Sequence, residues 1–255
     1  MVGSINSSSL SGAQVTTVSS AQGDSAKAAT AVPATTGQKD TSRLSPLSRQ
    51  LSESAARAAA RDASLSRKEL GAKASELLGQ ISGDGYFANK AANDAEVPAT
   101  DDPELLARAR NATDFVNGNG RNPFAGMSQD QLSLIIYDDS GNFTANERRA
   151  AWSESSDQEY AWRQKAVASA MAEYNETGKL TKFFTSALEH YKELPAIEQA
   201  QYPNSYEAKL QTWIALDFNY KTHTVEGQGS PQAILDKVLA LDSETFDESR
   251  SGPAV

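Results

Sequence analysis

The chain has 255 residues, a formal net charge of −9 and no cysteine, and its length suits one large or two small domains. The lack of cysteine excludes disulfides, thiolate catalysis and cysteine-based zinc sites. The acidic balance argues against general nucleic-acid binding, which needs cationic surface, and no apolar run is long enough to predict a membrane span.

The first fifty residues differ in composition from the rest of the chain. They contain eleven serines, four basic residues and two acids, and no aromatic residue precedes Tyr86. Such a low apolar content cannot offset the entropy of ordering the segment. We therefore predict a disordered arm over 1–43. Its start also lacks the charged residues and apolar stretch of a secretory signal.

Two helices are predicted next, as a helical extension over 44–82. Ser45 and Pro46 supply the N-cap and first residue of a helix that runs to about 62. Ser66 and Glu69 form a capping box for a second helix. Whether this extension packs on the rest of the chain stays open. The second helix carries apolar residues at helical spacing: Leu70, Ala74, Leu77, Leu78 and Ile81.

The aromatic residues lie between Tyr86 and Phe246 and predict a helical globular domain over 83–242. Apolar residues recur at helical spacing there, and no alternating strand pattern is convincing. The predicted fold is therefore all-α, a bundle of short helices with a flexible tail over 243–255. Predicted helix starts are Asp102, Ser128, Thr144, Asn204 and Ser230, with a further segment near 180–193.

A break is predicted inside the helix that Thr144 begins. The run 153–157 is polar, and Ser156 with Glu159 has the spacing of a new capping pair. We therefore predict that a second helix starts at Ser156 and that Gly178 ends it.

The segment from 138 to 147 is the best candidate for a binding site. When Gly141 is placed at the sixth position of a calcium loop, the oxygen-bearing positions are Asp138, Ser140, Asn142, Thr144 and Glu147. The segment thus resembles an EF-hand loop, and the resemblance implies bound calcium. Ile136 stands at the first ligand position without a side-chain oxygen, so the implied affinity is weak, about millimolar.

The same segment also fits an ordinary turn between two helices. Thr144 and Glu147 form a capping box, and Asp-Asp-Ser-Gly-Asn is typical turn composition. In this interpretation the protein has no cofactor. A fainter EF-hand resemblance near Gly85 raises the question whether Phe87 and Phe143 lie side by side, as in paired loops.

No catalytic residue is assigned from the sequence. His190 and His223 stand alone, outside any HExxH pattern, and no GxSxG or SxxK motif accompanies them. His190 is expected to be structural. A hydrolase with an unrecognised active site would need a pocket that joins a histidine to a carboxylate and a serine.

The N-terminal arm carries a second resemblance. It is rich in serine, has Ile5 near its start and has no acid before Asp24, and in this it resembles the export signals of type III secreted bacterial proteins. The resemblance implies secretion without a classical signal peptide, and a chaperone or other protein partner that docks on 44–82. Without export, a cytoplasmic location is expected.

The functional prediction from these patterns is a non-enzymatic helical interaction protein that carries no membrane span and binds no nucleic acid. Two alternatives stay open. One is a weak calcium-binding module built on the EF-hand-like loop. The other is a hydrolase whose active site the sequence does not reveal.

Overall fold

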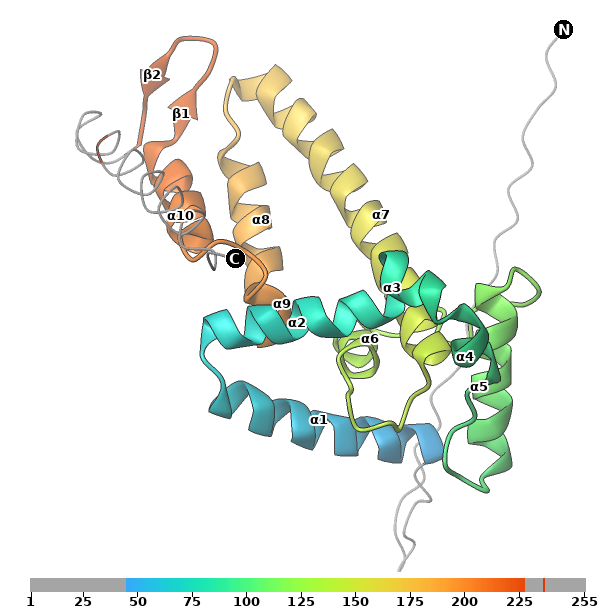
Figure 1. Ribbon diagram of the computed structural model, residues 1–255. Coiled ribbons are helices and arrows are strands. Elements are labelled where there is room, and N and C mark those ends of the chain that lie inside the picture. Colours follow the sequence, from blue (N-terminus) through green and yellow to red (C-terminus); the bar gives the residue numbers. More distant parts are fainter. Residues whose placement is uncertain (1–44, 228–235, 237–255) are drawn as a thin grey trace, which may run out of the picture. The chain divides into compact units, whose positions relative to one another are not determined.

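The computed structural model describes residues 45–227 and residue 236. The predicted arm 1–43 and tail 243–255 lie outside the described residues, as does all but one residue of the helix predicted from Ser230. The regular secondary structure of the described part is helical apart from one short hairpin, which confirms the all-α class. The helices (Figure 1) are α1 (Pro46–Ser64), α2 (Arg67–Ile81), α3 (Gly83–Ala88), α4 (Lys90–Ala95), α5 (Pro103–Val116), α6 (Gln129–Ile136), α7 (Ala145–Thr177), α8 (Thr181–Glu193), α9 (Ala196–Gln199) and α10 (Tyr206–Leu216).

Local side-chain caps begin most of the predicted helices. Asp102 accepts hydrogen bonds from the first amides of α5, whereas α10 begins at Tyr206, later than the predicted Asn204. In a capping box the cap side chain and the residue three positions on each accept the other's backbone amide. Complete boxes form at Ser66 with Glu69, Ser128 with Gln131, and Thr144 with Glu147.

α7 is one continuous helix of 33 residues, so the predicted break at 153–157 and the new start at Ser156 are wrong. Glu154 and Gln158 instead hydrogen-bond the backbone of the loop before α6. Serine and aspartate cost only about 0.5 kcal/mol each inside a helix, so these contacts outweigh the local preference for a break. Gly178 ends α7 in the left-handed conformation, as predicted.

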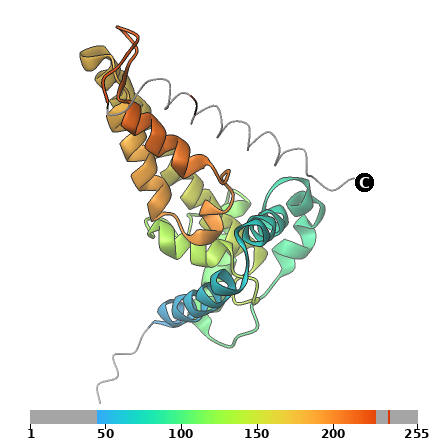
Figure 2. The same cartoon turned by 90° about the vertical axis from the view of Figure 1, so that its left-hand side faces the viewer.

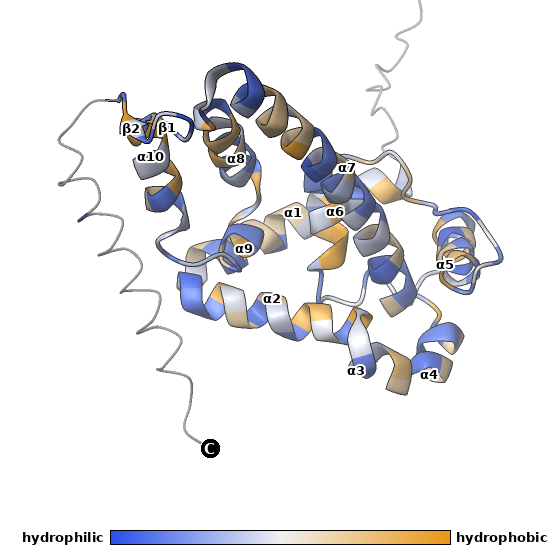
Figure 3. Cartoon of the chain, turned by 90° about the horizontal axis from the view of Figure 1, so that it is seen from above, coloured by the Kyte–Doolittle hydropathy of each residue, from blue (hydrophilic) through white to orange (hydrophobic). Residues whose placement is uncertain are grey.

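The hydrophobic core lies between α2, α6 and the first half of α7, with the hydrophobic residues of α6 in the middle of the surrounding helices (Figure 3). α1 packs Leu47 and Leu51 against it. The two helices of 44–82 therefore share one core with the helices that follow, which answers the question the sequence left open. Buried members of the core include Leu70, Ala74, Leu77 and Ile81 of α2, Leu132, Ile135 and Ile136 of α6, and Ala150 and Ala151 of α7.

The second half of α7 extends beyond this core and packs on α8, which packs in turn on α10. β1 (Phe218–Asn219) and β2 (Thr224–Val225) then form an antiparallel hairpin, and His223 lies in its turn with φ 57°. The Tyr220 amide donates to the Gly178 carbonyl at 2.7 Å. The hairpin is thereby tied to the end of α7, remote from α1 (Figure 2). None of the described helices has the length and apolar character needed to cross a membrane.

Candidate functional site

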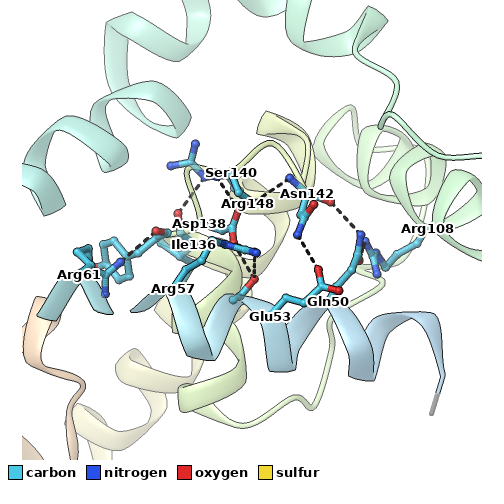
Figure 4. Close-up of polar contacts among 12 residues, drawn as sticks. Gln50, Glu53, Arg57, Arg61, Arg108, Ile136, Asp138, Ser140, Asn142 and Arg148 are labelled. Carbon is cyan, nitrogen blue, oxygen red and sulfur yellow. Dashed lines mark hydrogen bonds and ion pairs between the residues drawn. The ribbon is translucent and has the colours of Figure 1, made fainter. Parts of the chain in front are cut away.

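The loop between α6 and α7 carries the predicted calcium ligands and lies against α1 (Figure 4). The Asp138 side chain is only 1% exposed. Its Oδ2 accepts from Ser54 Oγ at 2.7 Å and Arg57 Nη2 at 2.6 Å, and its Oδ1 accepts from the amide and hydroxyl of Ser140. Burial acts to raise the pKa of Asp138, but the bonds from Ser140, Ser54 and Arg57 outweigh it and hold the pKa below its ordinary value.

Glu147 is fully buried in the first turn of α7. Its Oε1 accepts from Arg108 Nε at 2.7 Å, and its Oε2 accepts from the Thr144 amide at 2.9 Å. The guanidinium of Arg108 also faces the rings of Phe124 and Phe143, at 5.8 and 5.0 Å from their centroids. Both the ion pair with the carboxylate and the cation–π contacts with the aromatic rings stabilise this buried guanidinium.

Four of the five predicted ligands lie in the loop between α6 and α7 and the fifth, Glu147, lies in the first turn of α7. Protein donors already hydrogen-bond most of the oxygen atoms that would bind calcium. The Asn142 carbonyl accepts from Gln50 Nε2 at 3.2 Å, and its side chain donates to Glu53. Each carboxylate has its own arginine, Arg57 or Arg108. Over the described ranges, no three His, Cys, Asp or Glu side chains are grouped to hold a metal ion. A calcium ion would have to displace an arginine, and calcium binding stays a prediction.

The two rings of the paired-loop idea lie in different environments. Phe143 is 3% exposed and lies in the hydrophobic core beside Arg108. Phe87 is 62% exposed. Its ring contacts the ring of Tyr86 and the guanidinium of Arg149. The segment near Gly85 is part of α3. These contacts give the pairing of two EF-hand-like loops no support.

The first turn of α7 contains a buried asparagine that the sequence analysis did not identify. Asn146 is 0% exposed, and its Oδ1 accepts from the Tyr86 hydroxyl at 2.7 Å. Its Nδ2 lies within 3.1 Å of the Asn93 carbonyl, Asp94 Oδ1 and Thr113 Oγ1. One amide side chain thus joins α3, α4 and α5 to α7.

Two arginines follow in the same turn and bind the ends of other helices. Arg148 donates to the carbonyls of Leu77 in α2 and Ile136 in α6, each at 3.0 Å, and burial lowers its pKa. Arg149 donates to the carbonyl of Ile81 at 2.6 Å. The carbonyls of Ile81 and Ile136 belong to the last residues of α2 and α6, where backbone acceptors lack intrahelical partners. One feature of the sequence marked Arg148 as unusual: it stands at the position where a hydrophobic staple predicts an apolar residue.

A separate cavity of about 230 Å³ is lined by residues of α2, α6, α7 and α9. Glu198 lines it and is partly buried. Burial raises the pKa of Glu198 to about 7, against a hydrogen bond from Ser133 that lowers it, and the charges of Glu159 and Asp130 add to the rise. Three aromatic side chains also line the cavity: Tyr137, Trp152 and Tyr202.

His190 pairs with a carboxylate of this cavity. Its Nε2 lies 2.8 Å from Glu159 Oε2, and its ring stacks on Trp162 with centroids 3.7 Å apart. Ser156 lines the cavity together with Glu159. Among the described residues, neither contact of the His190 ring brings a serine hydroxyl to it, so the arrangement seen there is a histidine–carboxylate pair.

A third feature is an exposed apolar row on the second half of α7. Tyr160, Val167, Met171 and Tyr174 are 64%, 56%, 62% and 40% exposed. With Gln164 they recur at alternating steps of four and three residues, the spacing that places side chains in one row along a helix. We call these five residues the α7 face. The row lies within the helix predicted from Ser156 to Gly178, but its exposure depends on which side of α7 packs on α8, and that is decided by tertiary structure.

Comparison with known proteins assigns no family. No protein-family model matches the chain, and no curated protein and no solved structure matches it either. Functional inference therefore rests on three features of the described residues: the loop bonded to α1, the cavity beside Glu198, and the α7 face.

Replacing Arg108 by methionine tests the buried ion pair. We expect Arg108→Met to lower the free energy of unfolding by about 3 kcal/mol, because it leaves the Glu147 carboxylate buried without its cation. The measurement is urea unfolding followed by circular dichroism. Lys192→Met is the control, since Lys192 pairs with Glu207 where both side chains are exposed, and it should change stability little. Equal effects of the two substitutions would contradict this assignment.

Replacing Arg57 by alanine tests calcium binding at the loop. If the carboxylate of Asp138 can bind calcium once its arginine is removed, Arg57→Ala should bind more tightly than the wild type, which should bind no tighter than about millimolar. Calorimetric titration measures both. Arg49→Ala removes the same charge from an exposed position of α1 and controls for general electrostatics. Absence of binding heat in both the wild type and Arg57→Ala at millimolar calcium would remove the hypothesis.

Replacing Glu198 by glutamine tests the buried carboxyl group. Because folding raises the pKa of Glu198 from 4.5 to about 7, its carboxyl group stays protonated in the folded protein at pH values at which it is ionised in the unfolded chain. Its stability contribution is full below pH 4.5 and is lost as the pH rises through 7. Glu198→Gln should therefore be more stable than the wild type at pH 8, by on the order of 2–3 kcal/mol, and the difference should vanish near pH 4.5.

Thermal or urea unfolding across pH 4.5 to 8 measures this difference. Glu189→Gln, at an exposed position of α8, is the matched control and should follow the wild-type curve. A Glu198→Gln variant whose advantage is the same at both ends of the range would contradict the raised pKa.

Proposed function

We propose that this protein is a non-enzymatic interaction protein that binds an apolar helix along the α7 face. The supporting observation is the exposure of four large apolar side chains in one row. Contiguous apolar surface of this kind on a folded protein typically marks an interaction site. Amphipathic helices bind through anchors at such helical spacing.

The anchoring of α7 supports the proposal. Its first turn is held by Glu147, Asn146, Arg148 and Arg149 to helices on several sides. Its second half packs on α8 through the opposite side of the helix. A helix fixed in this way presents its exposed row in one conformation, so binding need not order it first.

The region 44–82 is a second proposed contact surface for a protein partner or chaperone. The apolar stripe of α2 is buried in the core, so a partner would meet the outer side of α1. A groove of about 590 Å³ also lies between α1 and α6, on the side of α1 that faces the body, and Arg57, Arg61 and Tyr137 are among its lining residues. The proposed export role of 1–43 rests on composition alone.

Site-specific photo-crosslinking in producing cells tests the α7 face. We expect a photoreactive residue in place of Gln164 to yield one defined adduct, and Val167→Glu to abolish it without changing the melting temperature. Val97 is 70% exposed and lies outside the row, so Val97→Glu is the matched control and should leave the adduct intact. No defined adduct at position 164 would overturn the proposal.

A further inference from the structure

We propose that the partner of the α7 face is a second copy of this chain, bound in antiparallel orientation. This inference rests on the proposed function, and it adds the identity of the partner. The evidence comes from the spacing, the flanking residues and the pairing options of the row itself.

The spacing of the row is that of a coiled-coil seam. Tyr160, Gln164, Val167, Met171 and Tyr174 alternate steps of four and three residues, which is the pattern of core positions in a heptad. The contacts with α8 lie on the other side of α7: Trp162 stacks on His190, and Glu173 accepts from the first amides of α8. The seam therefore faces away from α8.

The residues beside the seam permit close approach of an identical helix. Ala161 and Ala168 are exposed, and Ala170 is partly exposed. Small side chains at flanking positions let two helices pack closely. Two cations lie next to the row: Arg163, whose charge is balanced by Glu159 at 2.7 Å, and Lys221, whose ammonium lies 5.7 Å from the centroid of the Tyr174 ring. Two copies therefore bring few like charges together, and the face offers little charge to recognise a strongly acidic or basic partner.

The polar residue of the seam favours the antiparallel orientation. In antiparallel coiled coils the two kinds of core position face each other, so Gln164 would lie opposite Tyr174 of the second copy and Val167 opposite its Met171. The tyrosine hydroxyl and the glutamine amide supply matching donors and acceptors. In a parallel pair Gln164 would face Gln164. The first halves of α7, which other helices cover, would also have to lie side by side, and this disfavours the parallel orientation.

The exposed apolar area of the α7 face indicates how strongly two copies bind each other. Four side chains of this size, roughly half exposed, present on the order of 400 Å² per copy. A pair would then bury about 800 Å², which is less than a standard interface of about 1,600 Å². We expect a reversible dimer with a dissociation constant of about 10–100 µM.

The net charge predicts how this dimer responds to salt. Each copy carries −9, so the two repel each other at long range, and added salt screens this repulsion. Dimerisation should therefore strengthen as ionic strength rises. Binding to a basic partner would weaken under the same change, so the sign of the salt effect separates the two partners.

Analytical ultracentrifugation of the full chain over about 1–300 µM is the first experiment. The wild type should pass from monomer to dimer, with a larger dimer fraction in high salt. Val167→Glu with Met171→Glu should remain monomeric at every concentration, and Val97→Glu should dimerise like the wild type. A wild type that stays monomeric throughout would overturn self-association.

Thiol crosslinking tests the orientation, because the chain has no cysteine of its own. Gln164→Cys chains mixed with Tyr174→Cys chains should be joined by a short bis-maleimide, which alkylates one thiol of each chain, whereas Gln164→Cys alone should not. Efficient crosslinking of Gln164→Cys with itself would indicate a parallel pair and overturn the antiparallel assignment. If the protein is monomeric yet position 164 photo-crosslinks to a different protein, self-association fails while the proposed function stands.

Discussion

The burial of charged and polar groups in a single turn, at the start of α7, is the interaction on which the described fold depends. Glu147, Asn146 and Arg148 lie out of solvent there, and each is satisfied by groups from other helices. A buried polar group that loses its partner costs far more than an exposed one. The arrangement therefore favours one register of α2, α4, α5 and α6 around α7 and disfavours slipped alternatives, which apolar packing alone would specify less sharply.

The same chemistry accounts for the loop that resembles a calcium site. An EF-hand loop gathers carboxylates around a cation, and here the protein supplies its own cations, Arg57 and Arg108, to Asp138 and Glu147. One carboxylate joins the loop to α1, and the other joins α7 to α5. The oxygen-rich composition is explained by helix-to-helix bonds. The second half of α7 lies beyond these bonds, and four of its large apolar side chains are exposed.

Short-range features were predictable because their partners lie close in sequence. The capping boxes at Ser66, Ser128 and Thr144 join residues three positions apart, and the apolar stripe of α2 follows helical spacing. The same local rules failed at Ser156, where bonds from α7 to the loop before α6 outweigh the preference for a cap. The α7 face lies inside the helix predicted from Ser156, but its exposure depends on which side of α7 packs on α8, and no local pattern predicts that side.

The sequence by itself determined the all-α class, most helix starts and the turn at Gly141, because capping, helical periodicity and turn formation act over a few residues. Tertiary structure decided which charged groups are buried and which partners they pair with. Arg57 meets Asp138 and Arg108 meets Glu147 across 81 and 39 positions of the chain, and Glu198 acquires its raised pKa from burial and from acids on other helices. Burial and the choice of ionic partner arise only when distant segments pack, so no local pattern encodes them.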